Sequence, residues 1–182
     1  DRPEYADWWA VYWSDALRVN GQRLTPQGAR TYHAWIRQQV ASDRPLDAFA
    51  RDLILATGQV DQNGPANFYR AARTPSERAE QVASLFTGIR LECANCHNHP
   101  FERWTQANYH SFAAFFVQVR LVNRNENGQQ ISTVDLGGPQ VYRGPDQKEV
   151  SPAVLGDQPV DVPRAGDRRE ALARWLTAPE NP

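Results

Sequence analysis

The sequence predicts a mainly α-helical protein. Several segments repeat apolar residues at the three- and four-residue spacing of one helix face, and most of them begin with a pattern that caps a helix N-terminus. Only short stretches between residues 123 and 166 resemble strands. With 182 residues, 41% of them apolar, the chain is long enough to bury a core. We therefore expect a helical domain with an irregular Gly/Pro-rich arm or a small β-hairpin at about 123–166.

The first three helices are predicted from their spacing and their ends. The first spans residues 4–18, and we expect its aromatic face to belong to the core: Tyr5, Trp8, Trp9, Tyr12, Trp13. The second starts at Thr25-Pro26, an N-cap followed by a first-turn proline, and carries His33 on its inward face. The third follows Pro45 and stops before Gly58.

The fourth helix has the strongest start signal. After a predicted polar loop at 59–73, the segment Thr74-Pro75-Ser76-Glu77 is a capping box with proline in the first helical position. An apolar stripe at intervals of three and four then runs to both cysteines of the chain: Val82, Phe86, Ile89, Cys93, Cys96. This pattern predicts that the cysteines face the core at the C-terminal end of this helix, which ends before Pro100.

The rest of the chain predicts two more helices around an irregular region. Thr105 caps a helix that reaches about residue 119, and Asp167–Glu170 has the form of a capping box for the last helix. Between them, "QISTVDL" and "PQVYR" look like short strands. We expect a helical domain at 1–122, a linker or β arm at 123–166, and the first helix of a truncated following domain at 167–182. The chain contains no Met, so we expect it to be a processed or cut form of a longer protein.

The charge and hydropathy of the chain bear on the partners that we expect. Twenty Lys and Arg residues balance 21 Asp and Glu residues, for a net charge of -1, which gives no electrostatic reason to expect nucleic acid. No apolar run reaches the length of a membrane span. No Ser-His-Asp order, paired-carboxylate motif or phosphate-binding glycine loop stands out, so we expect an electron-transfer or binding domain rather than a stand-alone enzyme.

The segment "LECANCHNHPF", residues 91–101, contains the candidate cofactor- and metal-binding residues. In Cys93-x-x-Cys96-His97, two thiols can reach the two vinyl groups of a haem while the adjacent imidazole coordinates the iron. This spacing predicts covalently attached haem c with His97 as the iron ligand. A zinc site made by Cys93, Cys96, His97 and His99 is the alternative, and a version of it that uses His33 or His110 also remains open.

Other interpretations of the motif also remain. A redox-active thiol pair is disfavoured if the cysteines lie at a helix C-terminus, where the dipole opposes a thiolate. Two buried, unligated cysteines would leave His97 unexplained. Haem would need a sixth iron ligand other than Met, and the candidates are His110, His33 and, less readily, His99. Candidates to pair with haem propionates are Arg90, Arg103 and Arg120.

Long stretches of the chain resemble one known family. "GIRLECANCHNHPFERWTQANYHSFAAFF", preceded by "GPANFYRAARTPSERAEQVASLF", is similar to the secreted cytochrome-like domain of planctomycetes known as domain of unknown function fifteen-forty-nine. "DRREALARWLTAPENP" resembles the start of its companion domain, fifteen-fifty-three. The resemblance matches Cys93, Cys96 and His97 to the haem-type motif, and His99 and Trp104 to the "CHxHPF…WTQ" pattern that extends it. At His110 and His33 this sequence departs from the pattern.

The resemblance implies an exported bacterial protein, periplasmic or on the cell surface. The expected cofactor is haem c, with zinc as the alternative, and the expected binding residues are Cys93, Cys96, His97, His99, Arg103 and Trp104. The expected function is electron transfer to a redox partner protein. The companion C-terminal domain of the same parent chain is a second expected partner.

Overall fold

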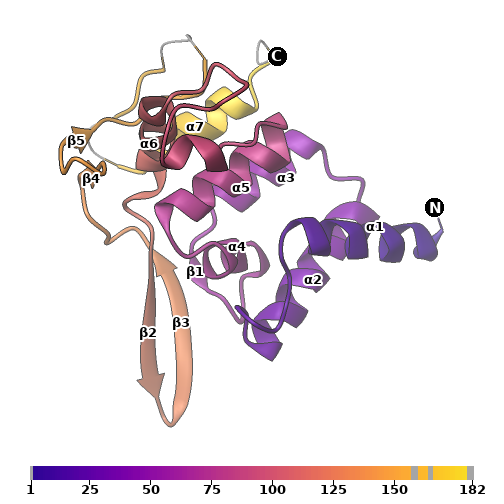
Figure 1. The fold of residues 1–182 in the computed structure, drawn as a ribbon. Helices are drawn as coiled ribbons and strands as arrows, with labels where there is room; N and C mark the ends of the chain where they lie inside the picture. The colour runs from indigo at the N-terminus through magenta and orange to yellow at the C-terminus, as the bar shows by residue number, and fades with distance from the viewer. Residues whose placement is uncertain (1, 157–159, 164–165, 180–182) are drawn as a thin grey trace. The chain divides into compact units, whose positions relative to one another are not determined.

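The computed structural model describes residues 2–156, 160–163 and 166–179. It is mainly helical with small antiparallel sheets, which confirms the predicted class (Figure 1). The chain forms two compact units, one made of residues 1–71 and 120–135 and the other of residues 72–119 and 136–182. In the described part of the chain, no helix has the length and hydropathy needed to cross a membrane.

The first unit contains four α-helices, a 3-10 turn and a three-stranded sheet. The helices are α1 (Pro3–Ala16), α2 (Pro26–Ala41), α3 (Leu46–Ile54) and α4 (Asn67–Ala71), with η1 (Gly64–Ala66) before the last. Thr25 caps α2 through its hydroxyl, which accepts a hydrogen bond from the Gly28 N–H at 2.9 Å. The cap and first-turn proline therefore start this helix as predicted.

The sheet has the order β1-β3-β2 and is antiparallel. Its strands are β1 (Gly58–Gln59), β2 (Arg120–Glu126) and β3 (Gln129–Asp135). The long hairpin of β2 and β3 turns at Asn127-Gly128, both with positive φ (52° and 80°), as a tight two-residue turn requires. Gly58 pairs with Val134, so β3 of the hairpin pairs with β1, the strand that follows α3 (Figure 1). A β-hairpin is therefore present in the predicted region, but it begins at residue 120, and the predicted strand "QISTVDL" pairs with residues 120–126 rather than with "PQVYR".

The aromatic face of α1 is not the core face that the sequence predicts. Tyr5, Trp8 and Tyr12 are 59%, 64% and 57% exposed. The fully buried side chains are Ala6, Ala10 and Leu17, on the side that packs against α2, while Trp9 and Trp13 are half-buried. The physical reason is steric, because alanines allow the two helix backbones to approach closely and the large rings then project beyond the contact.

The segment 59–73 is also more ordered than predicted. Instead of a polar loop it forms the end of β1, η1 and α4, and most of it is buried. Asn67 compensates for the burial of this backbone, since its amide donates to the carbonyls of Val60 at 2.7 Å and Gly64 at 3.1 Å. Gly64 lies so close to α2 that a Cβ there would come within 2.4 Å of the Trp35 Cβ.

The second unit is built around two capped helices. These are α5 (Pro75–Thr87) and α6 (Gln106–Ala113), followed by η3 (Ala114–Phe116); the short strands β4 (Tyr142–Arg143) and β5 (Glu149–Val150) pair with each other, and α7 (Arg169–Leu176) is the last helix. Thr74 and Glu77 form the predicted capping box of α5, and Thr105 caps α6. The capping box predicted at Asp167–Glu170 is wrong, because Asp167 instead binds the Arg169 backbone N–H and guanidinium.

Arg78 lies at the centre of this second unit with 1% of its surface exposed. Its guanidinium donates to four backbone carbonyls: Ala72 at 3.0 Å, Arg73 at 2.9 Å, Phe116 at 3.2 Å and Val119 at 2.9 Å. These bonds join the chain before α5 to the chain after α6. The division predicted from sequence, with domain limits at 122 and 166, stays a prediction.

Candidate functional site

The Cys-x-x-Cys-His segment lies on a short turn outside α5. Gly88 has a φ of 70° and ends that helix in the left-handed conformation, so the predicted stripe from Val82 to the cysteines does not continue on one helix. The turn η2 (Glu92–Asn95) follows, in which Ala94 is buried and Cys93 and Cys96 are exposed. The prediction that the cysteines face the core is therefore wrong, and the physical reason is the helix stop at Gly88.

The exposed position changes the chemistry that the thiols offer. Both cysteines are free and solvent-accessible, with no disulfide between them. Because α5 ends at Thr87, the unfavourable dipole of a helix C-terminus does not act on them as the sequence predicted. The thiols can therefore react with a partner group at the surface, and the dipole no longer argues against a thiol redox pair.

His97 is held in a defined tautomer. Its Nδ1 lies 2.7 Å from the backbone carbonyl oxygen of Asn98. A carbonyl only accepts hydrogen bonds, so Nδ1 carries the proton and, in the neutral ring, Nε2 keeps its lone pair. This is the arrangement of metal-binding histidines, in which one ring nitrogen donates to a backbone carbonyl and the other coordinates. The side chain is exposed, so Nε2 is accessible.

His99 has the opposite arrangement. Its Nδ1 accepts hydrogen bonds from the backbone N–H groups of Phe101 at 3.3 Å and Glu102 at 3.0 Å. In the neutral ring the proton is then on Nε2, which has no lone pair for a metal. His99 therefore stabilises the turn after Pro100, and coordination through Nε2 would require both hydrogen bonds to break.

The first turn of α6 holds the motif in place. The side-chain amide of Gln106 donates to the carbonyl of Asn95 at 3.0 Å, and the Gln106 backbone N–H donates to the Asn98 Oδ1 at 3.0 Å. The His99 N–H donates to the carbonyl of Trp104 at 2.8 Å. The loop between the cysteines and α6 is thus closed by hydrogen bonds at three points.

Trp104 and Arg103 lie at the end of this loop. Trp104 is 8% exposed, and its indole N–H donates to the Glu102 carboxylate at 2.8 Å. The guanidinium carbon of Arg103 lies 4.8 Å from the Trp104 ring centroid, a cation–π contact. Arg103 is exposed, so it can reach a bound carboxylate beside the motif.

His110 is a buried histidine of α6. It is 6% exposed, its Nδ1 lies 3.0 Å from the Tyr142 hydroxyl, and its buried Nε2 makes no hydrogen bond. Burial lowers the pKa of His110, and this effect exceeds the opposing effects of the Asn95 backbone and Asp146. The neutral ring lines a cavity of about 400 Å³ together with Gln106 and Ser111, and neither cysteine lines it.

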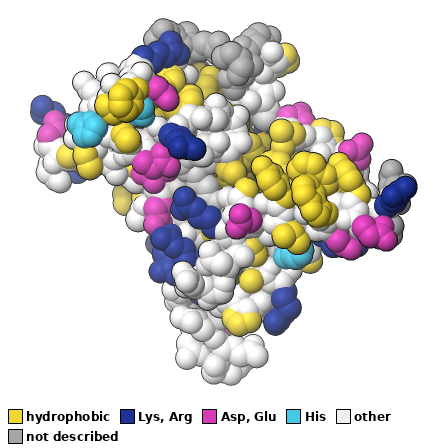
Figure 2. Space-filling view, turned by 45° about the vertical axis from the view of Figure 1, so that its right-hand side comes forward, with side chains coloured by type: hydrophobic (Ala, Val, Ile, Leu, Met, Phe, Trp, Pro, Cys, Tyr) yellow, Lys and Arg dark blue, Asp and Glu magenta, His cyan; other side chains and the backbone are white. Residues whose placement is uncertain are grey.

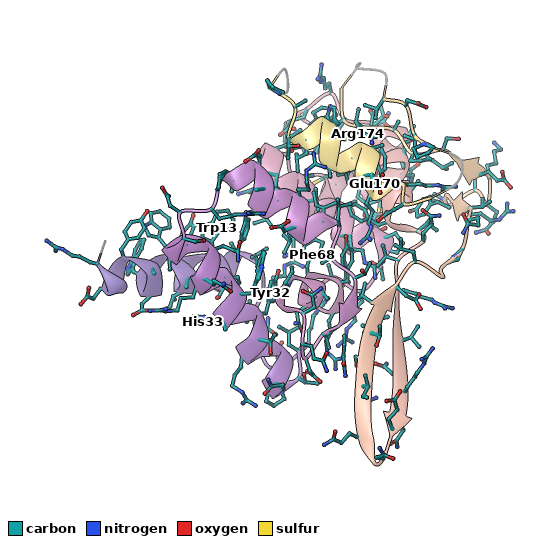
Figure 3. All side chains as sticks on the ribbon, turned by 180° about the vertical axis from the view of Figure 1, so that it is seen from behind. Trp13, Tyr32, His33, Phe68, Glu170 and Arg174 are labelled. Atoms are coloured by element: carbon teal, nitrogen blue, oxygen red, sulfur yellow. The ribbon has the colours of Figure 1, made fainter. Side chains whose placement is uncertain are left out.

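The remaining predicted residues are not gathered at the motif. His33 belongs to the first unit, on α2 beside Tyr32, and its buried Nδ1 makes no hydrogen bond (Figure 3). Arg120 also belongs to the first unit and forms an ion pair with Asp135 at 2.6 Å. Arg90 is exposed in the second unit. Across residues 2–156, 160–163 and 166–179, no three His, Cys, Asp or Glu side chains lie close enough to hold a metal ion by themselves.

Sequence reasoning gave no structural role to the residues that support the site. Gln106 and Asn98 act through hydrogen bonds that the N-cap pattern at Thr105 does not reveal. Tyr142 meets His110 from 32 positions along the chain, a contact for which the sequence contains no local signal.

Comparison with protein families gives one match. The model of PSCyt2, described as a protein of unknown function (DUF1549), matches residues 1–121, which include every residue from Cys93 to His110. Comparisons with curated proteins and with solved structures gave no match.

Proposed function

We propose that this chain, which belongs to the DUF1549 family of proteins of unknown function, is a cytochrome-like domain that carries one covalently attached haem c for electron transfer. Cys93 and Cys96 would form the thioether bonds, and Nε2 of His97 would bind the iron. The observation that carries the proposal is the hydrogen bond from His97 Nδ1–H to the Asn98 carbonyl, beside two free and exposed thiols.

The residues present fit this group in their chemistry. Thioether formation needs reduced, accessible thiols, and axial ligation needs an accessible neutral imidazole nitrogen. Haem supplies reversible one-electron chemistry when it is bound. The exposed cysteines imply a cofactor at the surface of the second unit, where Arg103 would pair with a propionate and Trp104 would form part of the apolar floor.

His110 is the better candidate for the sixth ligand. It belongs to the same unit as the motif, burial lowers its pKa, and its buried Nε2 makes no hydrogen bond. The protein's contribution would be to keep an imidazole nitrogen without a hydrogen-bond partner in position.

The setting of the domain follows from the chemistry. Haem c is attached to reduced thiols outside the cytoplasm, so the proposal includes a periplasmic or cell-surface location. It also includes a companion domain in the same bacterial, planctomycete-type parent chain and a redox partner protein.

The test is expression of the chain together with a cytochrome c maturation system. We expect a Soret band, a pyridine haemochrome typical of two thioether bonds, and an intact mass increased by one haem. Cys93→Ala combined with Cys96→Ala should lose the covalent haem. The matched variant His99→Gln should keep it, because His99 is not proposed as an iron ligand.

One result would replace the proposal. Protein without a Soret band but with stoichiometric zinc by elemental analysis would support the zinc site of Cys93, Cys96 and His97. His99 would then have to give up its hydrogen bonds to Phe101 and Glu102, or another ligand would complete the tetrahedron.

A further inference from the structure

The first unit carries an aromatic pocket that is independent of the cysteine motif. A cavity of about 230 Å³ is formed by residues of α1, the C-terminal end of α2 and α3. Four of its lining residues are aromatic: Tyr5, Trp9, Trp13, Phe49. Figure 2 shows the hydrophobic side chains gathered on this side of the molecule, where Tyr5 and Leu46 are more than half exposed.

The rings form inclined walls. The Tyr5 and Trp9 centroids are 6.2 Å apart with the planes at 58°, and those of Trp13 and Phe49 are 5.2 Å apart with the planes at 52°. Aromatic faces carry negative potential, and rings set at an angle can present several faces to one occupant. Such a wall attracts a cation more strongly than it attracts a neutral group of the same size.

Two further features of the pocket favour positive charge. Asp43 lines it, and the Asp43 carboxylate forms no ion pair with any residue that the structure describes. The pocket also touches the last turn of α2 at Gln39 and Val40, the negative end of a 16-residue helix dipole. The lining cation, Arg44, is already engaged, because its guanidinium binds Asp52 at 2.8 Å.

We propose that this pocket binds an alkylated ammonium cation, with the methyl groups against the rings and the positive charge close to Asp43. The volume corresponds to about eight waters at roughly 30 Å³ each, enough for a trimethylammonium group and part of its chain. A purely apolar ligand would gain nothing from the exposed Asp43 carboxylate, and an anion would be repelled by both the carboxylate and the helix dipole.

Calorimetric titration of the full chain with choline chloride tests this inference. The comparison ligand is 3,3-dimethylbutan-1-ol, which has the shape of choline without its charge. We expect choline to bind saturably and the neutral alcohol to bind at least about tenfold more weakly, in buffers of equal ionic strength. A parallel titration with trimethyllysine distinguishes a free quaternary ammonium compound from a modified lysine side chain as the source of the head group.

A charge-neutral variant provides the second test. Asp43 has a φ of 50°, and asparagine adopts this conformation readily, so Asp43→Asn should keep the fold. We expect this variant to bind choline about tenfold more weakly, the loss expected when a nearby unit charge is removed from a partly solvated site. Asp47→Asn, on the exposed first turn of α3 and outside the lining residues, is the matched control and should bind like the wild type.

Two outcomes would overturn the inference. Equal affinity for choline and the neutral alcohol would show a general apolar groove, and the absence of saturable binding by either cation would show that the pocket has no such ligand. Because the ligand comparison uses the wild-type chain, neither outcome depends on a variant that might misfold.

Discussion

Replacing Arg78 by methionine should destabilise the second unit strongly. The side chain is 1% exposed and donates to four backbone carbonyls, at Ala72, Arg73, Phe116 and Val119. The Phe116 carbonyl also accepts from the Val119 N–H at 3.2 Å, so it keeps a partner after the substitution. The other three carbonyls lose a charged donor, at about 1–2 kcal/mol each. We therefore expect the free energy of unfolding to fall by about 3–6 kcal/mol, a large part of the roughly 5–15 kcal/mol of a typical domain.

Urea titration followed by far-UV circular dichroism measures this change. Arg78→Lys should lower the free energy of unfolding by about 2 kcal/mol, because one ammonium group cannot reach both the carbonyls before α5 and the carbonyls after α6. Arg73→Met, at an exposed neighbouring arginine, is the control and should change stability by less than about 0.5 kcal/mol. A loss below about 1 kcal/mol for Arg78→Met would refute the reasoning, since it would mean that the four hydrogen bonds do not contribute to the folded state.

Three further predictions concern a buried histidine, a helix cap and a close approach of backbone. Burial lowers the pKa of His110, so below about pH 6.5 the unfolded chain binds more protons than the folded chain and stability should fall as the pH decreases. His110→Asn should make the unfolding temperature less dependent on pH between pH 7 and 5. An unchanged pH dependence would contradict the attribution to His110. Thr74→Ala removes half of the capping box of α5 and should cost about 1 kcal/mol in urea unfolding. Gly64→Ala forces a Cβ against a tryptophan of α2 and should cost about 2 kcal/mol, whereas Gly21→Ala, with open space around it, should change stability by less than about 0.5 kcal/mol.

The helix starts could be predicted because their signals are local. Thr25, Thr74 and Thr105 each cap a helix in the structure, and each is followed at the expected distance by the backbone N–H that its side chain binds. The hairpin of β2 and β3 was not predicted in this form, although Asn127-Gly128 is a local signal for its turn.

The position of the cysteines could not be predicted from periodicity. Apolar residues on both sides of Gly88 happened to keep the helical interval, although the helix stops there and the chain continues in another direction. The glycine itself was the available signal, because helices commonly end at a left-handed residue and that residue is usually glycine. Giving that glycine more weight than the stripe would have placed Cys93 and Cys96 on a turn.

The face of α1 shows a second limit of sequence patterns. Rings and alanines both count as apolar in a pattern, but only the alanines Ala6 and Ala10 are buried against α2. Which side of a helix is buried depends on how closely its neighbour approaches, and that neighbour is distant in the sequence.

The pairing of Gly58 with Val134 has a practical consequence for anyone preparing this protein. The family match ends at residue 121, within β2, whereas β3 spans Gln129–Asp135 and lies between β1 and β2 in the sheet. A fragment cut at the family limit would lose β3 and all of β2 except Arg120 and Leu121. The hydrogen-bonding groups of β1 would then have no partner strand, and the Val60 N–H would lose the Ser132 carbonyl to which it donates. Expression clones should therefore extend beyond Asp135, and a shorter clone that precipitates would report the missing strand rather than an unstable domain.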